Sequence, residues 1–214
     1  MNLSRPLSSL IPTLEGEVLT VLAGAQTSFT GDQVHAIIGK FSDRGVRNAL
    51  QRLSAQGIVT RTPAGAADLY ELSPEHLMAK YIRSIAGLRK ELIRSIKEEV
   101  SGWKFAPVCA ALFGSAVRAD MRADSDIDIF LVRPASIEMG FGPWEEQSAT
   151  LTSKVSKWTG NDARVFELSE TEVEEGIILN EGVIMNIINE GVIFFGDDGY
   201  LRSLRYKKSS KSHG

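Results

Sequence analysis

Three short stretches near the start of the chain place apolar residues every third or fourth position. This spacing predicts helices over residues 10–25, 31–38 and 42–57. Gly24, Gly39 and Gly57 act as stop signals at the ends of these helices, and Ser42 is suited to cap the third helix at its N-terminus. We therefore expect three consecutive short helices.

A β-hairpin is expected directly after the third helix, with strands at residues 58–61 and 68–72. Three helices and a hairpin in this order resemble the winged-helix form of the helix-turn-helix family, over about residues 10–73. The resemblance implies that the stretch GVRNALQRLSAQGIVTR holds the recognition helix and the first wing strand. The polar residues expected to contact DNA or RNA there are Arg44, Arg47, Asn48, Gln51, Arg52 and Arg61.

The charge of this module leaves a second interpretation open. Residues 1–74 hold 6 Lys and Arg against 6 Asp and Glu, whereas a self-sufficient DNA binder is usually basic. Since winged helices also serve as protein-interaction modules, a partner protein is the alternative to nucleic acid.

One long amphipathic pattern runs from residue 74 to about 101. Apolar residues recur at steps of three or four along it, with Lys and Arg on the other faces. This pattern predicts a single connecting helix that packs on a neighbouring domain. A helix that forms a homodimer is the alternative.

From Pro107 the pattern changes to short apolar runs separated by helical stretches. Strands are expected over residues 107–114, 126–132, 162–168 and 191–196. Between them, residues 144–160 read as a helix, and a second helix carries Ile184, Ile187 and Ile188. A short helix is expected to begin at Ser115.

Composition narrows the setting of the protein. The single cysteine, Cys109, lies within an apolar run, so no disulfide framework is expected, and a reducing cytoplasmic location fits best. No stretch approaches the roughly 20 apolar residues of a membrane span, so we expect no membrane partner. Charge is uneven, because residues 103–200 hold 7 Lys and Arg against 17 Asp and Glu. Such acidity suits a bound cation better than a nucleic-acid backbone.

Two carboxylates share one face of the strand DIDIFLV. Asp126 and Asp128 are two positions apart and so point the same way, and Glu167 lies on a neighbouring predicted strand. Carboxylate oxygens of this kind suit Mg²⁺ or Mn²⁺, which also take ligands from substrate phosphates. Gly114 allows close backbone approach, and Ser115 with the adjoining amides is placed to cradle a triphosphate.

The stretch GSAVRADMRADSDIDIFLV resembles the signature of DNA polymerase β-like nucleotidyltransferases, especially the minimal bacterial and archaeal forms, over roughly residues 103–196. The resemblance implies transfer of a nucleoside monophosphate from an NTP to an acceptor hydroxyl. It implies metal-binding and catalytic roles for Asp126, Asp128 and a third carboxylate, with Glu167 the first choice and Asp162 the other. Residues at the family's nucleotide-binding positions are Gly114, Ser115, Arg118 and Ser125.

Together these patterns predict an α+β chain: a winged helix over 1–73, a connecting helix over 74–102, a nucleotidyltransferase domain over 103–200 with a small mixed sheet flanked by helices, and a basic flexible tail over 201–214. The leading hypothesis is a metal-dependent enzyme. A DNA-binding regulator whose transferase domain senses NTP or is inactive is one alternative. Another is an antitoxin-type enzyme that modifies a separately encoded toxin protein.

Overall fold

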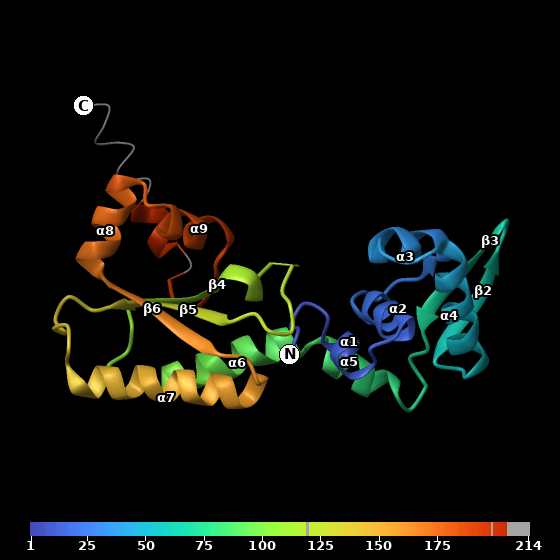
Figure 1. The fold of residues 1–214 in the computed structure, drawn as a ribbon, viewed down its shortest axis with the longest axis horizontal. Coiled ribbons are helices and arrows are strands. Elements are labelled where there is room, and N and C mark those ends of the chain that lie inside the picture. The colour runs from blue at the N-terminus through green and yellow to red at the C-terminus, as the bar shows by residue number, and fades with distance from the viewer. Residues whose placement is uncertain (119, 198, 205–214) are drawn as a thin grey trace. The chain divides into compact units, whose positions relative to one another are not determined.

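A computed structural model describes residues 1–118, 120–197 and 199–204 of the chain (Figure 1). The predicted flexible tail is wrong at its start, because residues 201–204 are helical and Leu201 is buried in a hydrophobic core; the part beyond residue 204 lies outside the described residues. The chain divides into two compact units, one covering Asn2–Arg89 and the other beginning at Lys90 and also including Met1. Each unit has its own hydrophobic core. The architecture is α+β.

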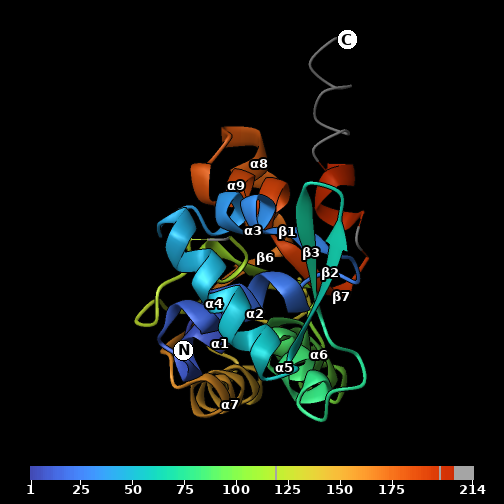
Figure 2. The ribbon, with the colours of Figure 1, turned by 90° about the vertical axis from the view of Figure 1, so that its right-hand side faces the viewer.

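The first unit is helical with a small antiparallel sheet. Its elements, given at the end of this paragraph, include the three helices and the two hairpin strands expected from the sequence, and add a short first helix and a two-residue strand (Figure 2). The strand order is β1-β3-β2, with both pairs antiparallel. The elements are α1 (Pro6–Leu10), α2 (Leu14–Ala23), β1 (Phe29–Thr30), α3 (Gly31–Ile38), α4 (Asp43–Ala55), β2 (Val59–Ala64), β3 (Ala67–Leu72) and α5 (Ala79–Ala86).

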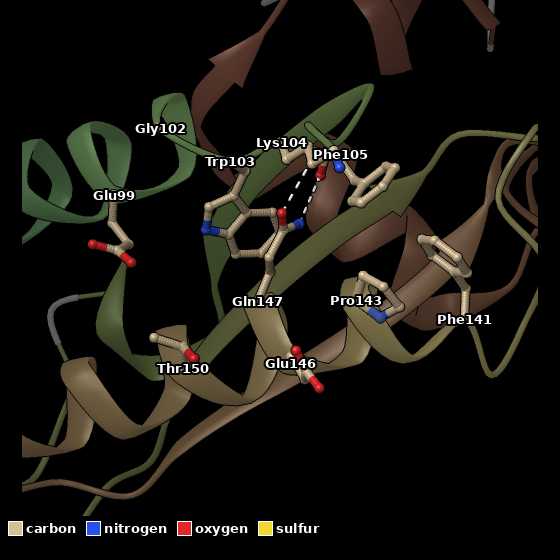
Figure 3. A pocket seen from close by; sticks show the side chains of 10 residues that line it. All are labelled: Glu99, Gly102, Trp103, Lys104, Phe105, Phe141, Pro143, Glu146, Gln147 and Thr150. Carbon is tan, nitrogen blue, oxygen red and sulfur yellow. Dashed lines mark hydrogen bonds between the residues drawn. The ribbon is translucent and has the colours of Figure 1, made fainter.

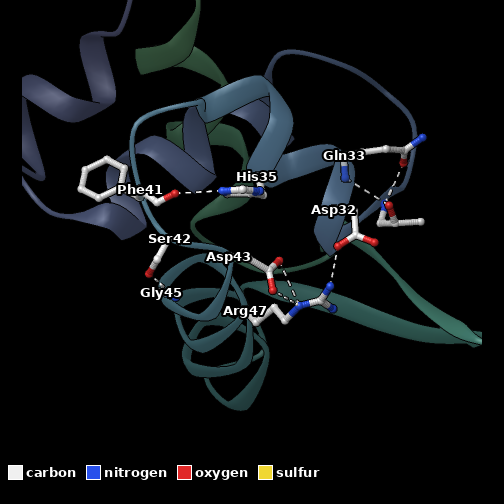
Figure 4. Close-up of polar contacts among 9 residues, drawn as sticks. Asp32, Gln33, His35, Phe41, Ser42, Asp43, Gly45 and Arg47 are labelled. Carbon is white, nitrogen blue, oxygen red and sulfur yellow. Dashed lines mark hydrogen bonds and ion pairs between the residues drawn. The ribbon is translucent and has the colours of Figure 1, made fainter.

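Local capping explains where these helices begin. The Ser42 hydroxyl accepts a hydrogen bond from the amide of Gly45 at 3.2 Å, which confirms the predicted cap of α4 (Figure 4). Thr30 and Gln33 form a reciprocal capping box at the start of α3. Both helices then bury one apolar face, with Val34 and Val46 at 0% exposure. Packing of these faces forms the core of the first unit.

The predicted single helix over 74–101 is two helices. α5 ends at Ala86 and α6 (Leu88–Ser101) starts again after Gly87. Glycine is a poor helix former because its backbone loses much conformational freedom on folding, which explains a break at this position. The boundary between the two compact units falls within the first turn of α6, after Arg89.

Glu17 is a buried carboxylate in the first unit, 5% exposed, and it supports one prediction. It is paired with Arg5 and with Lys40, whose Nζ lies 2.7 Å from Oε1. Burial raises the pKa of Glu17, but the hydrogen bonds and charges of Lys40 and Arg5 outweigh it and hold that pKa below its ordinary value. A lowered folded-state pKa means that the pairs stabilise the fold above the unfolded-state pKa.

We expect Glu17→Gln to lower the free energy of unfolding of the first unit by about 1–3 kcal/mol at pH 7, because charged hydrogen bonds are lost at a buried site. The difference from wild type should shrink as pH falls below about 4.3, because the unfolded wild-type chain then takes up a proton at Glu17, and it should vanish once the pH is below the lowered pKa of the folded state. Urea titrations at pH 7 and pH 3.5 measure this. Glu71→Gln, at a half-buried position in the same unit, is the matched control. An undiminished difference at the lower pH would contradict the assignment.

The second unit is a four-stranded mixed sheet with helices on both faces. Its strand order is β6-β5-β4-β7; β5 and β6 run parallel and the other pairs antiparallel. Helices α6 and α7 lie on one side of the sheet, and α8 and α9 lie on the other (Figure 1). The elements after α6 are β4 (Cys109–Phe113), the 3₁₀ turn η1 (Gly114–Ala116), β5 (Ile127–Arg133), α7 (Gly142–Thr159), β6 (Ala163–Ser169), α8 (Glu170–Leu179), α9 (Gly182–Glu190) and β7 (Val192–Gly196).

Helix α8 is absent from the sequence-based expectation, although the sequence carries a signal for it. Ser169 and Glu172 form a capping box at its start, in the spacing that marks a helix N-terminus. Its apolar residues Val173 and Ile177 join α9 in the core above the sheet. No helix in the described part of the chain has the length and apolar character needed to cross a membrane.

Candidate functional site

Asp126 and Asp128 lie at the start of β5, where the sequence places them. Asp128 is opposite Phe113 on β4 and opposite Arg164 on β6. Asp126 comes one residue before the strand begins and points to the same side as Asp128, because side chains alternate along a strand. Phe130 continues this face and belongs to the core formed with α8 and α9. The two carboxylates therefore sit at the edge of that core, at one end of the sheet.

The electrostatics of this pair show that the two negative charges interact. Burial raises the pKa of the Asp128 carboxyl above its ordinary value, and the neighbouring Asp126 charge raises it further. Arg164 and Arg118 act in the opposite direction. A guanidinium nitrogen of Arg164 lies 2.9 Å from Oδ2 of Asp126. Arg164 is thus ion-paired with one of the two carboxylates.

Gly114 lies against Asp128 and has no room for a side chain. Its φ of +69° is in the left-handed region, and a Cβ built there would overlap the Asp128 carboxylate. The Asp128 side chain therefore lies close to the Gly114 backbone, and the contact of Gly114 with a nucleotide stays a prediction. The helix predicted after it is a single 3₁₀ turn, Gly114–Ala116, so Ser115 lies on a tight turn instead of at the start of a longer helix.

Arg118 and Ser125 are tied to neighbouring loop residues. Arg118 contacts Asp120 at 3.3 Å and Glu190 at 3.4 Å, and all three side chains are exposed. The Ser125 hydroxyl accepts a hydrogen bond from the amide of Arg122 at 2.9 Å. These contacts shape the loop that leads into β5.

Asn161 is a positioning residue that sequence reasoning missed. It is 5% exposed, and its side-chain amide donates to the carbonyls of Ala123 at 2.9 Å and Ser125 at 2.8 Å. These two bonds hold the residues just before Asp126. A lone asparagine next to a predicted strand gives no sequence signal for such a role, because its partners lie more than 30 positions away.

The structure does not bring Glu167 to the aspartates. In the parallel ladder Glu167 pairs with Leu131, on the opposite face from Asp128 and Phe130. There its Oε2 accepts from Trp144 Nε1 at 2.6 Å and its Oε1 from Arg133 Nε at 2.7 Å. Glu167 thus joins β5, β6 and α7 on the far side of the sheet.

Across the described residues no group of three or more His, Cys, Asp or Glu side chains is placed to hold a metal. Asp162, the other predicted third carboxylate, is exposed and makes no such group with Asp126 and Asp128. Asp126 and Asp128 are therefore the two carboxylates that are placed to bind a metal ion together. They fit a Mg²⁺ or Mn²⁺ ion that takes its other ligands from water and from the phosphates of a nucleotide, which is how Mg²⁺ is commonly bound.

A shallow pocket of about 530 Å³ lies away from this pair, beside α6 and α7 (Figure 3). Trp103, Phe105 and Phe141 line it, together with the acidic Glu146. The side-chain amide of Gln147 closes one wall by bonding to both the amide and the carbonyl of Phe105. None of the predicted site residues lines this pocket.

In the first unit, three of the predicted nucleic-acid contacts form ion pairs with carboxylates. Arg47 pairs with Asp32 and with Asp43, the latter at 2.9 Å (Figure 4). Arg52 pairs with Glu15 at 2.5 Å and Arg61 with Asp68 at 2.7 Å. The remaining predicted contacts, which are exposed on helix α4, are Arg44, Asn48 and Gln51. The ion pairs of Arg47, Arg52 and Arg61 involve exposed guanidinium groups and are therefore weak, so a phosphate can replace the carboxylates as their partner.

Comparison with known proteins gives one family match. Residues 89–191 match the model of a family described as "Nucleotidyltransferase domain". A search of curated proteins finds no match. Among solved structures, the chain is similar to a mutant of the toxin-antitoxin MntA-HpeT, with 16% identity, a TM-score of 0.39, and coverage of 56% of this chain and 86% of that one. A toxin-antitoxin solved with AMP-PNP shows 17% identity, a TM-score of 0.36 and coverage of 58% and 86%.

The matched residues include β4, η1 and β5, and with them Gly114, Asp126 and Asp128. They also include α7, β6, α8 and α9, whereas the last strand of the sheet, β7, lies just beyond the match. The sequence motif and the family match cover the same part of the chain, and the match supports a nucleotidyltransferase domain in residues 89–191.

Proposed function

We propose that the protein is a metal-dependent nucleotidyltransferase that moves a nucleoside monophosphate from an NTP to an acceptor hydroxyl. The observation that carries this proposal is the placement of Asp126 and Asp128 on one face, with Asp128 directly against the backbone of Gly114. Such an arrangement leaves two carboxylates at the point where a nucleotide's phosphates can approach a tight glycine turn. The family match over residues 89–191 supports the same reaction class.

The roles follow from position. Asp126 and Asp128 hold Mg²⁺ or Mn²⁺, and Gly114, Ser115, Arg118 and Ser125 contact the phosphates. The bound ion neutralises charge on the phosphates in the transition state. In the reaction the acceptor oxygen forms a bond to the α-phosphorus, and the bond from that phosphorus to pyrophosphate breaks. The acceptor's proton passes to solvent.

Calorimetric titration of the full chain with each of the four NTPs, with and without Mg²⁺, tests the nucleotide site. We expect saturable binding of at least one NTP that requires Mg²⁺. Labelled transfer to a co-purified or added acceptor then tests the reaction. Absence of binding by every NTP, in protein whose thermal unfolding is cooperative, would overturn the proposal.

A second candidate is a regulator that binds NTP without transferring it. The absence of a third carboxylate from the described residues around Asp126 and Asp128 favours it, because such a group would orient or deprotonate the acceptor. The two candidates differ in one result. Mg²⁺-dependent NTP binding with no pyrophosphate release under any acceptor condition supports the regulator.

For the first unit we propose a winged-helix role in recognition of nucleic acid or of a partner protein. Helix α4 and the β2–β3 hairpin have the expected order, and Arg44 is exposed on α4. Fluorescence anisotropy with duplex DNA at rising salt tests the nucleic-acid version. A binding constant that does not change with salt would favour the partner protein. The separately encoded toxin of an antitoxin-type system is one such partner and acceptor.

A further inference from the structure

Arg164 stands on β6 at the position that faces the aspartate pair. In the ladder it lies directly opposite Asp128, and its guanidinium bonds to Asp126 at 2.9 Å. The next residue of β6 on this face is Phe166, whose ring stacks on Phe130 with centroids 5.8 Å apart. The side chains of β6 that share the face of the aspartates are therefore Arg164, Phe166 and Leu168.

The charge balance of the site changes because of this arginine. Asp126 and Asp128 together carry a charge of −2. The ion pair with Arg164 reduces the net charge of this group to about −1. A free divalent cation must then displace the guanidinium from Asp126 or bind beside a like charge. A nucleotide triphosphate removes this conflict, because its phosphates offer the guanidinium a bidentate partner.

The freedom of the Arg164 side chain allows such an exchange. It is 67% exposed, whereas the Asp126 side chain is 31% exposed. An exposed ion pair of this kind is worth little in free energy, so little is lost when the guanidinium leaves Asp126. The long side chain can turn toward a ligand at the sheet edge without any change in the core.

We propose that Arg164 couples metal binding to nucleotide binding: it occupies Asp126 when no nucleotide is present and moves to the phosphates of an NTP when the metal–nucleotide complex binds. The inference rests on the proposed function. In this arrangement Arg164 weakens binding of a divalent cation alone and strengthens binding of the cation–NTP complex. Arg164 thus competes with the metal for Asp126 and contacts the phosphates directly once the complex is bound.

The test uses two readouts on the full chain. Electron paramagnetic resonance measures binding of Mn²⁺ alone, and calorimetry measures binding of the Mg²⁺ complex of the NTP that the wild type prefers. We expect Arg164→Gln to bind Mn²⁺ alone about tenfold more tightly and the Mg²⁺–NTP complex about tenfold more weakly. The two effects have opposite signs, whereas a merely structural role would weaken both.

Two further variants make the result specific. Arg164→Lys keeps the cation and should bind Mn²⁺ alone as weakly as wild type. Lys157→Gln, an exposed position on α7, makes the same change of net charge in the same unit and should move neither constant by more than about twofold.

Failure of this inference and failure of the proposed function are distinguishable. The inference alone is overturned if wild type binds Mg²⁺–NTP but Arg164→Gln binds Mn²⁺ no more tightly than wild type does, including the case in which neither binds Mn²⁺ alone. It is also overturned if Arg164→Gln binds Mg²⁺–NTP as well as wild type. Absence of Mg²⁺–NTP binding in wild type overturns both.

Discussion

Asp128→Asn should lower the affinity for Mg²⁺–NTP at least about 100-fold, since even residues that only support a metal ligand typically change metal affinity by 10–100-fold. The substitution keeps the size and shape of the side chain beside Gly114 but removes the charge. Because burial and Asp126 both disfavour the charged form of Asp128, its neutral replacement should leave the melting temperature unchanged or raise it. Calorimetry and thermal unfolding on the same samples measure both effects.

Glu167→Gln is the control for this prediction. Glu167 lies on the opposite face of the sheet, between Trp144 and Arg133, so its loss should change Mg²⁺–NTP affinity by less than about threefold. Its effect should appear as a lower melting temperature instead. Equal losses of nucleotide affinity in the two variants would contradict the assignment of the site to one face.

Trp144→Ala should destabilise the second unit by about 3–5 kcal/mol, the range found when a large buried aromatic side chain is removed. Trp144 is 1% exposed and packs edge-on against Trp103, with ring centroids 5.7 Å apart. The substitution leaves a cavity between α7 and the sheet and also removes the hydrogen-bond donor to Glu167. Guanidinium chloride unfolding of the full chain measures the loss.

Trp144→Phe separates the two contributions. It keeps a six-membered ring in the core but removes the indole N–H and part of the ring volume, so it should cost about 1–3 kcal/mol. Since the chain has two compact units, unfolding can show two transitions, and only the transition of the second unit should shift. A midpoint for Trp144→Ala equal to that of wild type would show that this packing does not stabilise the unit.

Patterns within one segment predicted much of this structure. Helical spacing found α2, α3 and α4, and Ser42 marked the start of α4. Alternation along β5 placed Asp126 and Asp128 on one face. Each of these features depends on residues close together in the sequence, where the period of a helix or strand fixes which side chains share a face.

Features that depend on pairing between distant segments were not predictable in the same way. The period of β6 shows that Glu167 and Phe166 point to opposite sides, but only the register with β5 decides which of them shares the aspartates' side. A shift of one residue would exchange them. The partners of Glu167, Arg133 and Trp144, lie 34 and 23 positions away in the sequence. The prediction of one helix over 74–101 was wrong for a different reason. The apolar stripe continues past Gly87, but the helical conformation is interrupted there.

The tight contact between Gly114 and Asp128 links the mutational fates of two positions that lie 14 residues apart in the sequence. A methyl group at position 114 needs the space that the carboxylate at position 128 fills, and φ at that position disfavours any side chain. Losses from substitutions at the two sites should therefore be less than additive, because either one alone removes the same arrangement. In evolution and in protein engineering, the two positions therefore behave as a single unit. Any residue other than glycine at position 114 displaces the carboxylate at position 128, even when the aspartate itself is retained.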